Sequence, residues 1–160
     1  MQLLFMQHAI YKMDDDLGRA AIISNGSPLF SGNTTSGESQ IRRYMIENDL
    51  IEAIIALPTD LFYNTGIGIY AFILSKNKRK ERKGKVQLIN AADFWVPLRK
   101  SLGNKRRELS RDDIREITEI YSSFKPGKYC KIFDNAIFLY KEYAVWQPLQ
   151  RTGSISTERV

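Results

Sequence analysis

Two adjacent aromatic residues, Phe62 and Tyr63, stand in a short polar loop between two apolar segments. Loops between strands are usually polar because water satisfies their backbone groups, so two large rings here need a surface to cover. A nucleic-acid base is one such surface, since aromatic side chains stack on bases. The alternative is that Phe62 is buried beneath the loop in the protein's own core. The sequence leaves both interpretations open.

A run of basic side chains is the second candidate for chemistry. Residues 76–85 hold seven basic residues and one acidic residue. Basic side chains bind phosphates, and the phosphate contacts that we predict in this run are Lys78, Arg79, Lys80, Arg82 and Lys83. A second basic cluster consists of Arg99, Lys100, Lys105, Arg106 and Arg107. The alternative for both is a solvated turn that keeps an edge strand from aggregating.

The composition favours an anionic partner. The 160 residues carry a formal net charge of +6, and 43% are apolar, which suits one globular domain. No apolar run reaches the roughly 18 residues needed to span a membrane. The single cysteine, Cys130, excludes an internal disulfide, so we expect a packed residue in a cytoplasmic protein. Three consecutive carboxylates at residues 14–16 cannot converge on one ion, so no metal site is expected.

Apolar spacing predicts the elements that must position these residues. Apolar residues repeat at helical intervals in three segments, and continuous apolar runs typical of buried strands occur between them. We expect helices at residues 1–13, 39–48 and 110–122, and strands at residues 19–24, 50–57, 67–74 and 86–90, followed by one or two aromatic strands within residues 131–148. The first helix lacks a capping residue before it, which indicates a fragment or a misplaced start.

The order of these elements predicts an α/β fold with a mixed sheet. Helix, strand, helix, strand implies parallel strands joined by helical crossovers. The strand at 67–74 follows the strand at 50–57 without an intervening helix, so we expect it to pair antiparallel.

Several segments together resemble a known family. They are Leu-Leu-Phe-Met-Gln-His (3–8), Gly-Arg-Ala-Ala-Ile-Ile-Ser-Asn-Gly (18–26), Ile-Arg-Arg-Tyr-Met-Ile-Glu-Asn-Asp-Leu-Ile-Glu-Ala-Ile-Ile-Ala-Leu-Pro (41–58) and Leu-Phe-Tyr-Asn-Thr-Gly-Ile (61–67). This order resembles the modification subunit of type I restriction-modification systems, in the adenine-N6 DNA methyltransferase group. The resemblance is close over residues 1–95 and looser over the tail.

Two motifs of that family are absent. The chain has no glycine-rich Gly-x-Gly-x-x-Gly turn, which cradles S-adenosylmethionine in the family, and no Asn-Pro-Pro-Phe, which binds the flipped adenine. In the family both motifs lie upstream of the first helix. The resemblance therefore implies the C-terminal half of a catalytic domain, with a partial Rossmann-like sheet. It implies S-adenosylmethionine as the cofactor of the complete protein, and we expect no cofactor binding by this chain alone.

The resemblance also implies an arrangement and a set of partners. The strand at 67–74 should lie between the strands at 19–24 and 50–57, antiparallel to both. Residues 1–95 form the methyltransferase part, 96–150 a C-terminal extension packed on it, and 151–160 a disordered tail. Phe62 matches the aromatic that packs on the flipped base, with Tyr63 as its neighbour.

The implied partners are DNA, the specificity and restriction subunits of a type I system, and the missing N-terminal half of the same subunit. The alternative function is a non-catalytic basic α/β module that binds nucleic acid or a partner protein.

Overall fold

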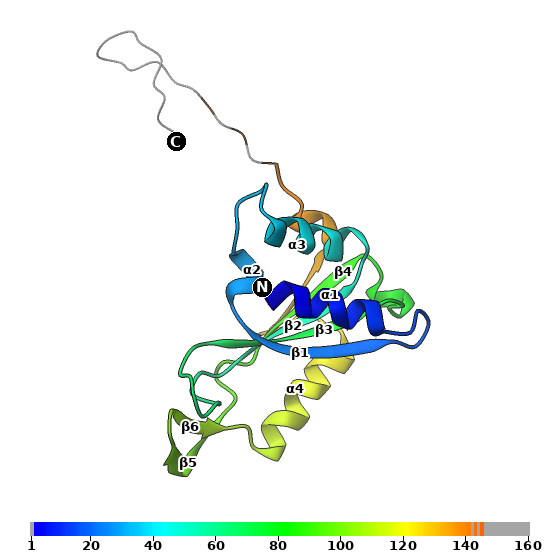
Figure 1. The fold of residues 1–160 in the computed structure, drawn as a ribbon. Coiled ribbons are helices and arrows are strands. Elements are labelled where there is room, and N and C mark those ends of the chain that lie inside the picture. The colour runs from blue at the N-terminus through cyan, green and yellow to red at the C-terminus, as the bar shows by residue number, and fades with distance from the viewer. Residues whose placement is uncertain (1, 142, 144, 146–160) are drawn as a thin grey trace, which may run out of the picture.

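A five-stranded mixed sheet forms the centre of the chain in the computed structural model, which describes residues 2–141, 143 and 145. Figure 1 shows helices α1 and α3 over one face of this sheet and α4 under the other. The helices are α1 (Gln2–Lys12), α2 (Ser27–Phe30), α3 (Gly37–Glu47) and α4 (Arg111–Ser123). The strands are β1 (Arg19–Asn25), β2 (Ile51–Leu57), β3 (Ile69–Ser75), β4 (Lys85–Asn90), β5 (Val96–Leu102), β6 (Lys105–Glu108) and β7 (Cys130–Asp134).

The strand order is β1-β3-β2-β4-β7, and β5 and β6 form a separate hairpin. Strand β3 lies between β1 and β2 and is antiparallel to both, with Phe72 opposite Ile22 on one side and Ile54 on the other. This confirms the predicted insertion of the third strand. Strand β4 is parallel to β2. Strand β7, from the aromatic tail, adds a second antiparallel strand beside β4.

Helix starts follow local capping chemistry. Ser110 and Asp113 form a reciprocal capping box at the start of α4, where the sequence predicts that a helix begins. Helix α3 is capped by Ser36, whose hydroxyl accepts the Ser39 amide hydrogen at 3.2 Å. Thr35 and Glu38 have the spacing of a capping box in the sequence, but the cap is Ser36, one residue later. The short helix α2 was not predicted.

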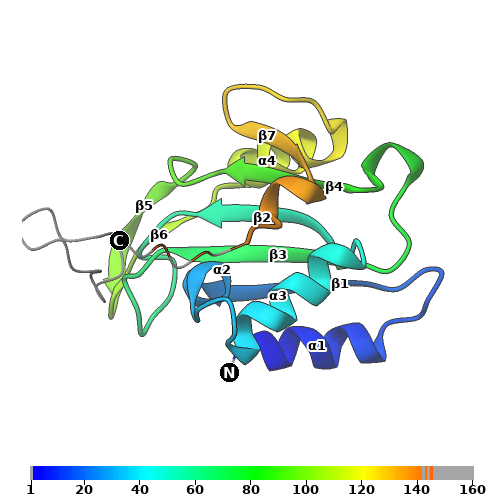
Figure 2. The same cartoon turned by 90° about the horizontal axis from the view of Figure 1, so that it is seen from above.

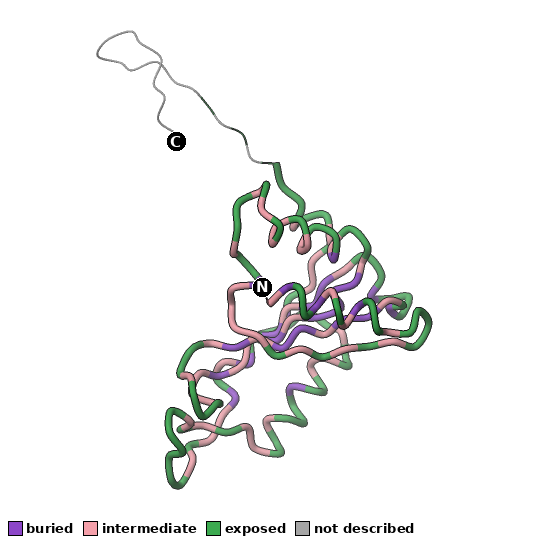
Figure 3. Tube along the Cα trace, in the orientation of Figure 1, coloured by how far each residue is buried: buried purple, intermediate pink, exposed green. Residues whose placement is uncertain are grey.

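The apolar side chains form one core on each face of the sheet. On the first face, Leu3, Met6 and Met45 from α1 and α3 pack on Phe72 and other sheet residues. On the second face, Ile117 of α4 packs with Ile55, Ile89, Phe94 and Cys130. Cys130 is buried, as predicted. Figure 3 shows the buried residues concentrated on the central strands. Ile114 shares the helical spacing of the apolar residues in α4, which predicts that it faces inward, but it is 51% exposed.

The carboxyl ends of the parallel strands meet at one end of the sheet. Strands β1 and β2 run in the same direction, since both are antiparallel to β3, and β4 is parallel to β2. Asn25 and Leu57 both stand opposite Ile69 in the register. Figure 2 shows that the loop after β2 and the hairpin β5–β6 lie at this end. Open α/β sheets place their ligands at this end.

Strand β1 is an edge strand among the described residues, because it pairs with β3 alone. Ile23 of β1 is half exposed. In the described part of the chain, no helix is long and apolar enough to cross a membrane. The predicted disordered tail, residues 151–160, lies outside the described residues, and the predicted domain division stays a prediction.

We expect Phe72→Ala to lower the free energy of unfolding by about 3–5 kcal/mol, because this ring is 2% exposed at the centre of the sheet. Ile23→Ala is the matched control on the half-exposed edge strand and should cost only about 1 kcal/mol. Urea unfolding followed by circular dichroism measures both. Equal losses for the two variants would contradict the assigned core.

Candidate nucleic-acid interface

The aromatic loop, residues 58–68, connects β2 to β3 at the carboxyl end of the parallel strands. Phe62 is 44% exposed and Tyr63 is 65% exposed. A β-bridge joins Phe62 and Thr65, which folds the loop tightly back on itself. The alternative in which Phe62 is buried beneath the loop does not agree with this exposure. Both rings are thus available to an external surface, while their role in base stacking stays a prediction.

The hairpin β5–β6 holds the aromatic loop in place through backbone hydrogen bonds. The Asp60 carbonyl accepts the amide hydrogens of Arg106 at 3.0 Å and Arg107 at 3.2 Å. The Tyr63 carbonyl accepts the amide hydrogen of Asn104 at 2.9 Å. The loop and the hairpin, about 40 residues apart in the sequence, are therefore fixed to one another.

The turn of this hairpin is shaped for contact with Tyr63. Gly103 has a φ of 61°, and a Cβ placed there would lie 2.8 Å from the Tyr63 carbonyl oxygen and 3.0 Å from its ring. Glycine alone accepts both constraints at no cost. The hairpin was missed by the sequence analysis. The dipeptide Gly103-Asn104 between the two basic segments is a recognised turn signature and could have located it.

A stacked arginine ties the base of the hairpin to the loop. The Arg107 guanidinium lies 4.0 Å from the centre of the Trp95 ring and donates a hydrogen bond to the Thr59 hydroxyl at 3.1 Å. Arg107 is therefore occupied within the fold. The second basic cluster of the sequence, by contrast, leaves Arg99, Lys100 and Arg106 exposed on the hairpin.

The predicted phosphate contacts lie near the start of β4, at the end of the sheet opposite to the aromatic loop. They divide into a buried group and an exposed group. Lys78 and Arg82 are buried. Lys78 donates to the Asp49 carboxylate and to the Lys85 carbonyl, and Arg82 donates to Gln87 at 2.8 Å. Because these side chains are used inside the fold, we no longer propose them as phosphate contacts. Arg79, Lys80 and Lys83 are exposed, and their contact with phosphate stays a prediction.

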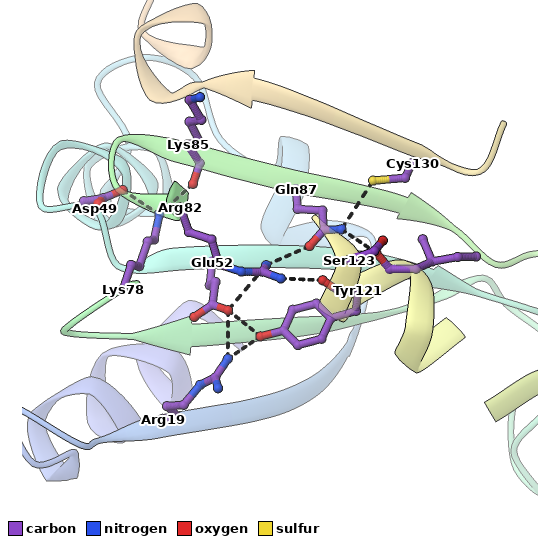
Figure 4. A network of polar contacts seen from close by, with 11 residues as sticks. Arg19, Asp49, Glu52, Lys78, Arg82, Lys85, Gln87, Tyr121, Ser123 and Cys130 are labelled. Carbon is purple, nitrogen blue, oxygen red and sulfur yellow. Dashed lines mark hydrogen bonds and ion pairs between the residues drawn. The ribbon is translucent and has the colours of Figure 1, made fainter. Parts of the chain in front are cut away.

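Glu52 is the centre of a buried polar network that includes Arg82 (Figure 4). Its carboxylate lies 2.8 Å from Arg19 and 3.5 Å from Arg82. The Tyr121 hydroxyl also donates a hydrogen bond to Glu52. The Arg82 guanidinium, 4.6 Å from the centre of the Tyr121 ring, donates to the Tyr121 carbonyl. These contacts join α4 to the sheet, so we assign the network a structural role.

The cavities found among the described residues lie away from the aromatic loop. A cavity of about 690 Å³ lies between α3 and the sheet, lined mainly by apolar residues such as Ile54, Phe72 and Leu88. Its lining contains no carboxylate and neither loop aromatic. Within the described part of the chain, no group of three or more histidine, cysteine or carboxylate side chains has a metal-binding arrangement.

We expect Tyr121→Phe to change how the free energy of unfolding depends on pH above pH 10. Burial, with help from the nearby Glu52 carboxylate, raises the pKa of Tyr121 to about 12. The unfolded chain ionises this phenol near pH 10, so the stabilisation is complete below pH 10 and is lost between pH 10 and about 12. The difference in unfolding free energy between the native protein and Tyr121→Phe should therefore shrink over that range, as urea unfolding at several pH values would show. Tyr11→Phe, at an exposed tyrosine, should show no such change. A difference that stays constant with pH would contradict the assignment.

We expect Gly103→Ala to loosen the contact between hairpin and loop. The left-handed backbone costs an alanine about 1–2 kcal/mol, and its Cβ would press on the Tyr63 carbonyl. Amide hydrogen exchange at Asn104 and Arg106 should accelerate, while exchange within β3 stays unchanged. Gly127→Ala is the control, because a Cβ at Gly127 meets nothing within 4 Å. Unchanged exchange in the Gly103 variant would show that the turn does not depend on glycine.

Comparison with known proteins places this geometry in a family. Residues 1–145 match the model of the family described as N-6 DNA Methylase. The chain is 37% identical over 117 residues to the type I restriction enzyme MjaVIII methylase subunit of Methanocaldococcus jannaschii, covering 72% of this chain and 19% of that protein. It is 34% identical over 115 residues to the HindI methylase subunit of Haemophilus influenzae, covering 72% of this chain and 24% of that protein.

Solved structures agree in fold. The methyltransferase subunit of a type I restriction-modification system from Streptococcus thermophilus superposes with a TM-score of 0.73 and 26% identity, over 84% of this chain and 26% of that one. The chain thus spans about a fifth to a quarter of the length of the relatives that it matches. From the match over residues 1–145 and these relatives, we conclude that the chain belongs to the N-6 DNA methylase family, among the methylase subunits of type I restriction enzymes.

Proposed function

We propose that this chain is the C-terminal part of the catalytic domain of a type I modification subunit. The complete subunit transfers a methyl group from S-adenosylmethionine to the N6 amino group of adenine in DNA. In this proposal the chain contributes the surface that receives the target base. The family match supports the reaction class, and the fold and the exposed loop support the role of this part.

The observation that carries the proposal is the position of Phe62 and Tyr63. Both rings are exposed on the loop that follows β2, at the end of the sheet where open α/β folds bind ligands. The hairpin β5–β6 fixes this loop through three backbone hydrogen bonds. A fixed aromatic surface loses little conformational entropy on stacking, so it is suited to hold a flat ligand.

Adenine must leave the duplex before its amino group can react, because base pairing hides that group. Extruding the base costs a few kcal/mol. Stacking on an aromatic side chain returns about 1–3 kcal/mol per base. In our proposal Phe62 stacks on the extruded adenine and Tyr63, resting on the Gly103 turn, shapes the rim of the same surface. Neither residue takes part in a proton transfer or forms a bond.

The residues of this chain do not fit S-adenosylmethionine. Of the parallel strands β1, β2 and β4, only β1 is followed within two residues by a glycine, Gly26. A Cβ at Gly26 would lie 3.2 Å from the Phe30 ring and 3.3 Å from the Tyr70 ring, so this glycine packs against side chains of the fold and does not begin a glycine-rich turn. We therefore assign the cofactor to the part of the subunit outside this sequence and derive no step through it here.

The remainder of the catalytic domain has a defined place in this proposal. Strand β1 pairs only with β3 among the described residues, so its outer edge is available for a strand of the N-terminal half. DNA and the specificity and restriction subunits are the further proposed partners. The alternative of a non-catalytic basic module is not favoured, because the family match covers residues 1–145.

Replacing Phe62 with alanine in the complete subunit should lower the methylation rate about 5- to 150-fold, which corresponds to the loss of one stacking interaction. The melting temperature should change little, because the ring is 44% exposed. Single-turnover transfer of a labelled methyl group and thermal unfolding measure the two effects. A target adenine opposite a mismatched base should restore part of the rate, since less energy is needed to extrude it.

Ile67→Ala provides the matched control, because this side chain is apolar, lies in the same loop and is 53% exposed. It should methylate at the normal rate. A large drop in melting temperature with normal turnover per folded Phe62→Ala molecule would end the base-stacking proposal, and so would a normal rate with normal stability. Tyr63→Ala would then be the next variant to measure.

A further inference from the structure

The hairpin β5–β6 carries an unneutralised positive charge next to the aromatic loop. Residues 96–108 contain five basic side chains and one carboxylate, that of Glu108. Arg107 is engaged with Trp95 and Thr59. The other four, Arg99, Lys100, Lys105 and Arg106, have no side-chain hydrogen bond or ion pair to any residue that the structure describes. Their charge is therefore free to meet an external anion.

The position of these side chains is fixed by the backbone. The Arg106 amide bonds to Asp60, and the Asn104 amide, one residue before Lys105, bonds to Tyr63. The basic side chains of β6 therefore lie next to the backbone amides that bond to Asp60 and Tyr63 of the aromatic loop. Figures 1 and 2 both show the hairpin projecting beyond the sheet at the end where the aromatic loop lies. Cationic and aromatic groups are combined here on one rigid unit.

We infer that the hairpin β5–β6 binds the phosphate backbone of duplex DNA beside the target base, through Arg99, Lys100, Lys105 and Arg106. This inference rests on the proposed function and adds a second contact to it. Aromatic rings next to free cationic groups match the two chemical features of a nucleotide, a flat base and an anionic phosphate. An acidic protein surface would use the charges and leave the rings without a partner, so the geometry favours DNA.

Phosphate contacts hold a protein in register on DNA and do not read its sequence. The hairpin should therefore contribute equally to binding of cognate and non-cognate duplexes. Its contribution should also weaken as salt rises, because each phosphate contact releases counterions and adds about 0.9 to the slope of log affinity against log salt concentration.

The opposite end of the sheet offers a matched control. Arg79, Lys80 and Lys83 are exposed and lie between β3 and β4, away from the aromatic loop. The triple variant Arg79→Ala, Lys80→Ala, Lys83→Ala removes one arginine and two lysines. The hairpin triple variant Lys100→Ala, Lys105→Ala, Arg106→Ala removes the same set. The two variants have equal net charge and differ only in where the charge is lost.

The test measures duplex binding by the complete methyltransferase, which combines the modification and specificity subunits, as a function of salt concentration. The hairpin triple variant should lose about fivefold in affinity per contact at 0.15 M salt, and its salt slope should fall by about 2 to 3. Cognate and non-cognate duplexes should lose affinity by the same factor. The control triple variant, which removes the predicted contacts Arg79, Lys80 and Lys83, should lose less affinity than the hairpin variant, and circular dichroism should show that both variants fold.

Several results would overturn the inference. Equal losses in the two triple variants would reveal a general charge effect, and a loss in the control alone would place the phosphate contact at the other end of the sheet. Normal DNA binding by the hairpin variant would also overturn it. If that variant instead failed to assemble with the specificity subunit, the hairpin would be a protein interface.

The salt slope is independent of the methylation readout. A normal methylation rate in Phe62→Ala together with a reduced slope in the hairpin variant would remove the base contact and leave the phosphate contact standing. A reduced methylation rate in Phe62→Ala together with an unchanged slope in the hairpin variant would remove the phosphate contact and leave the base contact standing.

Discussion

Strand β3 pairs along its length with β1 on one side and β2 on the other, and most of the remaining structure depends on this double pairing. Only a short loop without a helix connects β2 to β3, so the chain reverses directly after β2 and β3 runs against β2. Because β1 runs in the same direction as β2, β3 also runs against β1. The reversal after β2 is the aromatic loop. It leaves β1, β2 and β4 with their carboxyl ends at the same end of the sheet as the loop. The burial of Phe72 and Leu74 on β3 against α1 and α3 then fixes the strand and the register of both neighbours.

A loop that follows one strand and precedes another has few contacts of its own, and here the hairpin β5–β6 supplies them. One carbonyl, that of Asp60, accepts two amide hydrogens, from Arg106 and Arg107. Asp60 itself has a φ of 59°, an uncommon backbone conformation for a residue other than glycine. The Arg107 contacts with Trp95 and Thr59 hold the base of the hairpin against the same loop. A rigid surface for a ligand is thus built from two segments, neither of which belongs to the sheet.

The sequence predicted the sheet more completely than the site. Continuous apolar runs located β1 to β4 within two residues at each end. The central strands β2 and β3 are covered on both faces, which leaves little choice of residue. Strand β1 has no buried residue and was located by its apolar run alone. Ser110 located the start of α4 because its capping is a local interaction. The hairpin was not predicted, since its strands are basic and its stability comes from contacts with Asp60 and Tyr63, more than 30 residues away. The burial of Lys78 and Arg82 was also unpredictable from composition. A basic run is normally solvated, and only the fold brings Asp49, Glu52 and Tyr121 to meet it.

The outer edge of β1 has a consequence for the chain in solution. Seven residues, Arg19–Asn25, form a strand that is paired on one side only among the described residues, and Ile23 adds an exposed apolar side chain beside the unpaired backbone groups. Such an edge is a template for pairing with another strand. When this polypeptide is produced alone, the edge strands that β1 can meet are β1 and β7 of a second molecule, because both lie at edges of the sheet among the described residues. The isolated polypeptide should then associate more as its concentration rises. A peptide that pairs with the outer edge of β1 would keep the polypeptide in solution without touching the aromatic loop.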